Sequence, residues 1–99
     1  MKLLAIGRPR ANIDARSAIA HHAQTELRAL WSLYAEGFVR ELYSPGGPGA
    51  VLVIEADSLE VADQKLAELP LAANQIIDFE LIELRPFAAL RPLFSETET

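Results

Sequence analysis

The 99-residue sequence contains no cysteine and only two histidines, and its nine Lys and Arg residues are scattered along the chain. Without cysteine there is no disulfide framework and no thiolate to act as a nucleophile. A formal charge of −5 without a basic cluster argues against nucleic acid or an anionic membrane as a partner. The apolar run before Gly7 is too short for a signal-peptide core or a membrane-spanning helix. We therefore expect a cytoplasmic protein.

The residues that are present suit a folded domain. Hydrophobic residues make up 51% of the chain and charged residues 23%, which is ordinary for a globular protein with a core. Ninety-nine residues are enough for one domain. The last five residues, SETET, are polar and acidic, as in a frayed terminus. We expect a single domain over residues 1–94, followed by a flexible acidic tail at 95–99.

The period of the apolar residues changes several times along the chain. Four stretches have the composition and pattern of strands, namely residues 2–7, 38–43, 50–56 and 76–84. Two stretches have the helical period, namely residues 14–36 and 59–69. The segment SPGGPG between the second and third strands is typical of a hairpin turn.

Local signals mark where the helices begin and end. Gly37 follows the long helix at the position of a C-terminal cap. Asp57 and Glu60 have the spacing of a capping box at the start of the second helix. Pro86 and Pro92 interrupt regular structure after the last strand.

The resulting order, β-α-β-β-α-β, predicts a ferredoxin-like α+β domain. Its antiparallel four-stranded sheet is expected in the order 4-1-3-2, with both helices on one face. The strands 50–56 and 76–84 are apolar on both of their sides, although only one side is covered by helices. An apolar sheet face exposed to water is a liability. We therefore expect a homodimer or a higher homo-oligomer in which a second copy covers this face.

Several short motifs resemble the muconolactone isomerase family, whose members are dimeric α+β barrels. The sequence EGFVRELY, which includes Gly37 and Arg40, is similar to the family's helix end and following strand. The turn LPL at 69–71 and the strand segment IDFE at 77–80, ending before Pro86, also match the family's pattern. The resemblance implies a cofactor-independent isomerase acting on a small-molecule ligand. The chain has Ala23 where family enzymes carry lysine.

The long helix contains the most informative charged residue. At about 100° per residue, five apolar residues fall within one arc: Ile19, Ala23, Leu27, Leu30 and Tyr34. Glu26 lies beside this arc and His22 lies at its margin, whereas His21 points about 100° away from His22. Burial of a carboxylate raises its pKa toward the range useful for proton transfer. Glu26 is therefore either a catalytic or ligand-binding group, or a structural partner of His22 or an arginine.

A metal site is not expected from these residues. A metal ion needs three or four convergent ligands, and His22 with Glu26 supplies only two. A third would have to come from a distant carboxylate such as Asp78.

The strands contribute further candidates. Asp78 is a candidate catalytic carboxylate. The alternative for Asp78, and for Glu80 as well, is a structural ion pair. Arg40 and Tyr43 are the candidates for binding substrate. Arg8 and Arg10 either steer a carboxylate substrate or are solvated loop charges. Trp31 and Tyr34 are either core or dimer contacts or part of a ligand-binding aromatic cluster.

Three functional hypotheses follow. The first is a cofactor-free isomerase or lyase that moves a proton on a small unsaturated lactone or cyclic enol acid. Glu26, with His22 beside it, or Asp78 would be the base, and Arg40 would stabilise the enolate. The second is a non-catalytic small-molecule-binding or assembly module on the same barrel. The third, implied by sister families, is cofactor-free oxygenation of a quinol.

Overall fold

A computed structural model describes residues 1–95, so most of the predicted tail at 95–99 lies outside the described residues. The strands are β1 (Lys2–Pro9), β2 (Val39–Tyr43), β3 (Ala50–Glu55) and β4 (Ile77–Glu83). The helices are α1 (Ala15–Ala35), α2 (Leu59–Ala67), α3 (Pro70–Ala73) and α4 (Arg91–Ser95), with a 3-10 turn, η1, at Ala88–Leu90. Within these residues no helix is both long enough and apolar enough to cross a membrane.

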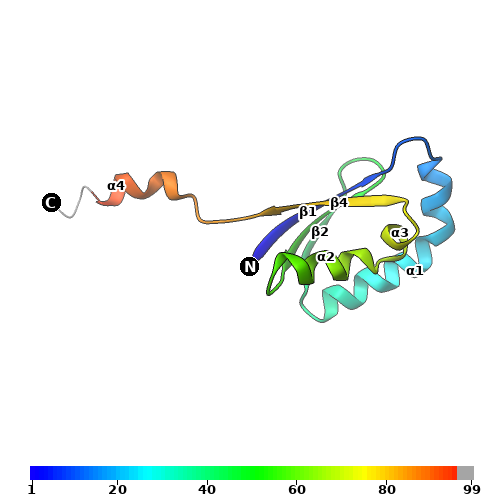
Figure 1. Cartoon of the computed structure of the whole chain (residues 1–99), viewed down its shortest axis with the longest axis horizontal. Helices are drawn as coiled ribbons and strands as arrows, with labels where there is room; N and C mark the ends of the chain where they lie inside the picture. The colour runs from blue at the N-terminus through cyan, green and yellow to red at the C-terminus, as the bar shows by residue number, and fades with distance from the viewer. Residues whose placement is uncertain (96–99) are drawn as a thin grey trace.

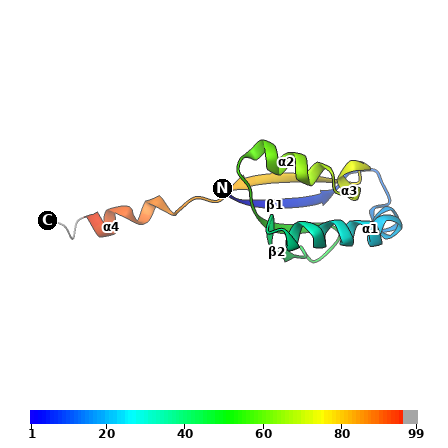
Figure 2. The same ribbon diagram turned by 90° about the horizontal axis from the view of Figure 1, so that it is seen from below.

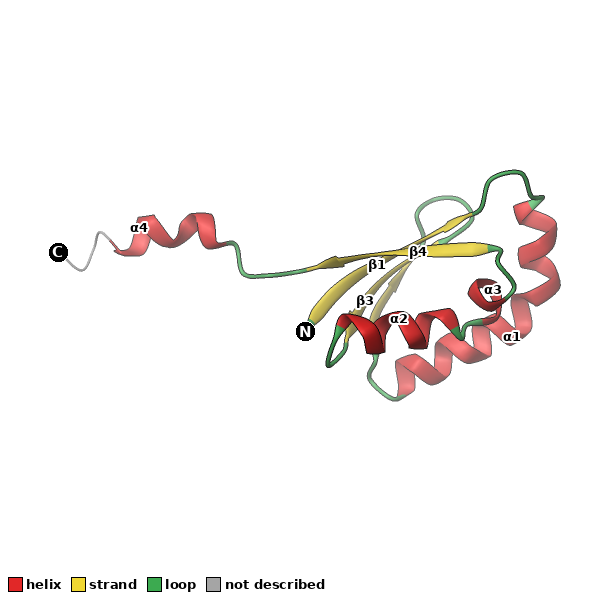
Figure 3. Ribbon diagram, viewed as in Figure 1, coloured by secondary structure: helices red, strands yellow, loops and turns green. Residues whose placement is uncertain are grey.

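The four strands form one antiparallel sheet in the order β2-β3-β1-β4. Helices α1, α2 and α3 all lie on the same side of this sheet, as Figures 1 and 3 show. The predicted α+β class, the βαββαβ order and the strand order are therefore confirmed. The short helix α3 was not predicted, because four residues are too few to produce a periodic pattern.

The core lies between the sheet and the helices. Leu3 and Ala5 of β1 and Leu52 and Ile54 of β3 are fully buried beneath the helices. Leu66 of α2 is also buried, at 1% exposure. Removing such side chains from water is the main contribution to stability.

The opposite face of the sheet is apolar at its centre. Leu4 of β1 lies between Val53 of β3 and Ile82 of β4, and Ile6 is paired with Val51. All but Ile82 are partly buried, and Ile82 is 39% exposed. The apolar outer face that the sequence pattern indicates is therefore present, and its coverage by a second copy stays a prediction.

The buried side of α1 differs from the predicted arc. Leu27 is 65% exposed and Tyr34 is 42% exposed, so they do not belong to the core. The buried side is instead centred on Glu26 and Leu33, about 80–120° away from Leu27 and Tyr34 on the helix. The predicted arc is wrong by this angle because the argument from helical angles treats every apolar residue as buried.

The start of α2 also differs from the prediction. The N-cap is Ser58, whose hydroxyl accepts a hydrogen bond from the backbone N–H of Val61 at 3.1 Å. Asp57 therefore does not cap the helix. A serine hydroxyl performs the same function as a carboxylate here, because either oxygen accepts from an otherwise unpaired N–H.

One close backbone approach requires glycine. A Cβ atom on Gly49 would lie 2.3 Å from the carbonyl oxygen of Gly7, and the φ angle of Gly49 is +123°. Only glycine accepts this conformation and this contact without strain. Gly49 thereby fixes the point at which β3 begins beside β1.

The chain after β4 leaves the body of the domain. Residues 84–95, which include η1 and α4, project beyond the end of the sheet in both views (Figures 1 and 2). The radius of gyration is 16.8 Å, whereas a compact domain of this length has about 13 Å. We call residues 84–95 the C-terminal arm and residues 1–83 the body.

Candidate functional site

An apolar pocket of about 310 Å³ lies between α1 and the sheet. Glu26 is the only acidic residue of its lining, and its side chain is 7% exposed. The other lining residues are apolar or glycine, and they come from four elements and the turn before β3: Ile19, Ala23, Leu27, Leu30, Gly49, Ala50, Leu71, Ile77 and Phe79. Apolar surroundings disfavour the charged form of a carboxyl group, so a carboxylate in such a pocket has a perturbed pKa.

The start of α3 holds Glu26 in place. The backbone N–H of Leu71 donates a hydrogen bond of 2.9 Å to Oε1 of Glu26. The first N–H groups of a helix have no partner within the helix. Pro70, at the first position, has no N–H of its own, so Leu71 provides the donor. Helix α3 thus connects to α1 through this buried carboxylate.

The pKa of Glu26 is raised above its ordinary value. The main cause is burial, which removes water from the charged form. The hydrogen bond from Leu71 and the nearby His22 imidazole act in the opposite direction and lower the pKa less strongly. Glu26 is therefore a carboxyl group that takes up a proton at a higher pH than an exposed glutamate.

The two histidines lie at the border of this site. His22 is partly buried and close enough to Glu26 to favour its ionised form. The rings of His21 and His22 meet edge to face with 4.9 Å between centroids, and His21 is exposed. Among residues 1–95, no group of three or more His, Asp or Glu side chains is arranged to hold a metal ion.

Asp78 lies away from the Glu26 pocket. On β4 it alternates with the pocket residues Ile77 and Phe79, so it points to the opposite side of the sheet. Both of its carboxylate oxygens accept from Arg10 Nε at 3.0 Å. Glu80, two residues further, accepts from Arg8 Nη1 at 2.8 Å. The structure thus assigns these carboxylates to ion pairs, the alternative considered from the sequence.

The predicted substrate-binding residues also lie outside the pocket. Arg40 donates from Nε to the carbonyl oxygen of Gly37 and fixes the turn after α1. The Tyr43 hydroxyl donates to Glu41 at 2.6 Å, and this bond raises the pKa of the phenol. Trp31 and Tyr34 form an exposed aromatic pair with centroids 5.6 Å apart. None of these four side chains lines the pocket of Glu26.

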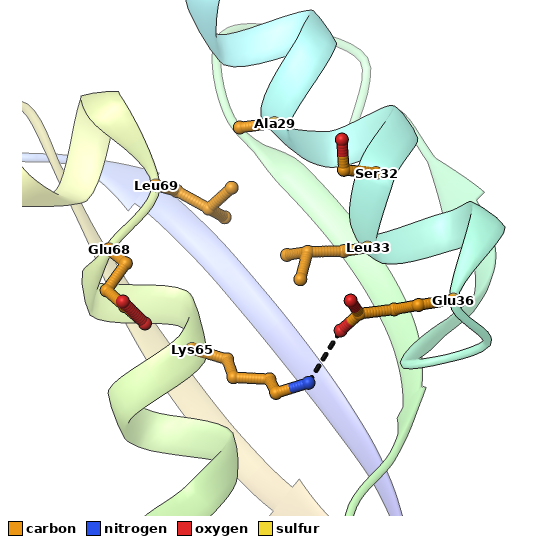
Figure 4. Close-up of a pocket in the computed structure, with 7 residues that line it drawn as sticks. All are labelled: Ala29, Ser32, Leu33, Glu36, Lys65, Glu68 and Leu69. Atoms are coloured by element: carbon orange, nitrogen blue, oxygen red, sulfur yellow. Dashed lines mark hydrogen bonds and ion pairs between the residues drawn. The ribbon is translucent and has the colours of Figure 1, made fainter.

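A second depression of about 290 Å³ lies between α1 and α2 (Figure 4). Lys65 of α2 and Glu36 at the end of α1 point toward each other across it and form an ion pair. The Lys65 ammonium also lies 5.0 Å from the centre of the Phe38 ring, as in a cation–π contact. Because the two charges neutralise each other, the residues of this groove are better explained as an ion pair that joins the two helices than as a reactive site.

Comparison with known proteins supports the fold. No protein-family model and no curated protein sequence matches the chain. Among solved structures, muconolactone isomerase is 21% identical with a TM-score of 0.67, and the match covers 87% of this chain and 90% of that one. The 5-chloro-2-hydroxyhydroquinone dehydrochlorinase TftG from Burkholderia phenoliruptrix AC1100, in complex with 2,5-dihydroxybenzoquinone, is 18% identical with a TM-score of 0.63, over 86% of this chain and 94% of that one. The resemblance to muconolactone isomerase is confirmed at the level of the fold.

Proposed function

We propose that the protein is a muconolactone isomerase-like catalyst that moves a proton on a small unsaturated ring compound without a cofactor, with Glu26 as the acid-base group. The observation that carries the proposal is the buried Glu26 carboxyl in an otherwise apolar pocket. Burial raises the pKa of Glu26 toward the pH at which a carboxylate accepts and returns a proton efficiently. His22 is close enough to favour the ionised form, which is the form that acts as a base.

The geometry of Glu26 fits a proton shuttle. Leu71 fixes Oε1, so Oε2 is the oxygen left to exchange a proton with a bound ring. The carboxylate removes a proton from a carbon that a carbonyl group has made acidic. It then returns the proton to a conjugated carbon, so the double bond shifts and no electron leaves the substrate. A single carboxyl group can perform both steps.

The pocket also restricts the substrate. A volume of about 310 Å³ is at the lower end of ligand pockets, which favours a single ring. No lining residue carries a positive charge, and Ala23 provides only a methyl group to the wall. A carboxylate substrate would therefore meet ionised Glu26 without a compensating cation. We infer that the substrate is an uncharged lactone or cyclic enol rather than an enol acid.

Proton exchange with solvent tests this proposal. The full-length protein is incubated in D2O with a panel of uncharged butenolides, cyclic enols and one butenolide acid, and deuterium on ring carbons is followed by NMR. We expect incorporation with an uncharged member. We also expect Glu26→Gln to slow it by about 10²–10⁴-fold, the usual contribution of a general acid-base group. Unchanged exchange in Glu26→Gln would remove Glu26 from the mechanism.

Glu26→Gln is a suitable variant because a glutamine oxygen can still accept the Leu71 N–H. The matched control is Glu80→Gln, which removes one exposed carboxylate from the opposite side of the sheet. Its exchange rate is expected to equal that of the parent. If both variants lost activity equally, the effect would be one of net charge or folding rather than proton transfer.

A non-catalytic binding module is the second candidate, because one observation favours it. The bond between Leu71 and Glu26 connects α3 with α1, which is a structural reason to retain a buried glutamate. This candidate predicts that ring compounds raise the melting temperature without any deuterium exchange. The quinol oxygenation hypothesis is distinguished by oxygen uptake with a dihydroxybenzene, a compound class related to the quinone named for the TftG complex.

A further inference from the structure

The Glu26 pocket has a second hollow beside it, along the free edge of β4. This hollow has a volume of about 260 Å³. It is lined by residues that follow β1 or belong to α2, α3 and β4: Arg10, Asp63, Leu66, Ala67, Ala72, Ile77, Asp78 and Phe79. We call it the β4 depression. Of the described residues, Ile77 and Phe79 alone line both hollows, so their side chains form the wall between them.

The ring of Phe79 occupies its place because Gly7 has no side chain. The two residues are paired across β1 and β4. Gly7 alternates with the outer face and is buried on the same side of β1 as Leu3 and Ala5, beneath the helices. A Cβ atom on Gly7 would lie 2.8 Å from Cε1 of the Phe79 ring. The ring therefore lies close over the backbone of β1, in space that a side chain would fill.

The two residues of the wall differ in how deeply they are buried. Ile77 is 3% exposed and forms a buried cluster with Leu71 and Ile76. Phe79 is only partly buried, and it packs against this cluster and against the main core. Removing the Phe79 ring would therefore join the two hollows without emptying the centre of the core.

The lining of the β4 depression suits an uncharged group. Arg10 and Asp78 at its border form an ion pair of 2.9 Å and neutralise each other. Leu66, Ala67 and Ala72 supply apolar surface. A fused hydrocarbon ring could thus occupy the depression if the wall were open, since burial of apolar surface is favourable.

We propose that Phe79 determines substrate size, because its ring ends the Glu26 pocket after one ring and keeps a fused second ring out of the β4 depression. The inference rests on the proposed function, since it takes the Glu26 pocket as the substrate site. It narrows the substrate class to single-ring lactones or enols. The competing explanation is that Phe79 only covers a strand glycine, as aromatic residues do in other sheets. That explanation predicts a loss of stability in Phe79 variants without any change in ligand selectivity.

Binding of two uncharged lactones by the full-length protein tests the inference. Angelica lactone has one ring, and isocoumaranone is its benzo-fused counterpart. Dissociation constants are measured by NMR titration for the parent and for Phe79→Ala. We expect the ratio of the two constants to shift by at least about tenfold in favour of isocoumaranone in Phe79→Ala, because extra carbons in an apolar pocket change affinity by about 10–200-fold. Phe79→Leu retains apolar packing and should shift the ratio in the same direction, so it decides the question if Phe79→Ala does not fold.

Refilling the β4 depression provides a matched control. Ala67 lines the depression but not the Glu26 pocket, and it is exposed at the end of α2. Ala67→Leu alone should leave both dissociation constants unchanged. Combined with Phe79→Ala it should abolish the gain for isocoumaranone, because leucine fills the space that the second ring would occupy. A ratio that neither Phe79 variant changes, or a gain that survives Ala67→Leu, would overturn the inference, as would failure of both lactones to bind the parent and the variants.

Deuterium exchange separates this inference from the proposed function. If the ratio shifts as expected but the parent exchanges no ring proton, Phe79 determines ligand size in a binding pocket and the catalytic proposal fails. If the parent exchanges protons of angelica lactone but the Phe79 variants keep the parent's ratio, the proposed function stands and the role of Phe79 is wrong.

Discussion

Replacing Glu26 by glutamine should change how stability depends on pH. The folded parent has a Glu26 carboxyl whose pKa is raised by burial above the ordinary value of 4.5. Glutamine has nearly the same shape and can still accept the 2.9 Å hydrogen bond from Leu71, but it does not ionise. The variant therefore separates the effect of the charge from that of the contact.

The direction of the effect follows from proton binding. Below about pH 4.5 Glu26 is protonated in both the folded and the unfolded chain, so the pH has no effect through this group. Between that pH and the raised pKa, the folded chain retains a proton that the unfolded chain has lost. The free energy of unfolding of the parent then falls by up to about 1.4 kcal/mol per pH unit. Above the raised pKa the difference is constant. Stability contributed by protonated Glu26 is thus present at low pH and lost as the pH rises.

Urea unfolding at a series of pH values between 4 and 8 measures this effect. We expect the free energy of unfolding of Glu26→Gln minus that of the parent to increase from pH 4.5 upward and then level off. Glu68→Gln is the control, since this glutamate is an exposed residue at the end of α2. If the difference between Glu26→Gln and the parent stayed constant with pH, Glu26 would not carry a burial-raised pKa and the account of the pocket would be wrong.

Three further predictions concern the fold and the second carboxylate. Gly49→Ala should lower the free energy of unfolding by about 1–3 kcal/mol, because the alanine Cβ would clash with Gly7 and the φ angle is unfavourable for alanine. A melting temperature equal to the parent's would refute this. Leu66→Ala should cost about 2–5 kcal/mol in urea unfolding, since it empties a buried core position; a loss below about 1 kcal/mol would show that the helix is not packed as described. Asp78→Asn should cost less than about 1 kcal/mol because it breaks only an exposed ion pair, and it should leave deuterium exchange unchanged; loss of exchange would place Asp78 in the reaction.

The sequence was informative about the fold because each element has a strong local signal. The strand predicted at 76–84 is observed at Ile77–Glu83, and the helix predicted at 14–36 is observed at Ala15–Ala35. Glycines and prolines fixed the ends of these segments. The strand order followed from the sequence of elements, since few topologies connect them.

The site was only partly accessible to the same reasoning. Glu26 could be identified because a carboxylate near the apolar side of a helix requires a partner. That partner is the N–H of Leu71, 45 residues away, and no periodic pattern reveals such a contact. Strand alternation places Asp78 and Phe79 on opposite sides of the sheet, but it does not tell which side the helices cover. Leu27 and Tyr34 were placed on the buried side wrongly, because an exposed apolar residue contributes to the helical period in the same way as a core residue.

The pH dependence of deuterium exchange, measured with the ring compound that the parent exchanges fastest, tests the central claim most directly. If ionised Glu26 is the base, kcat/KM of the parent should rise with pH through an inflection above 4.5, and this inflection should be absent from the residual rate of Glu26→Gln. An inflection of the same position and size in Glu26→Gln would contradict the claim that Glu26 transfers the proton.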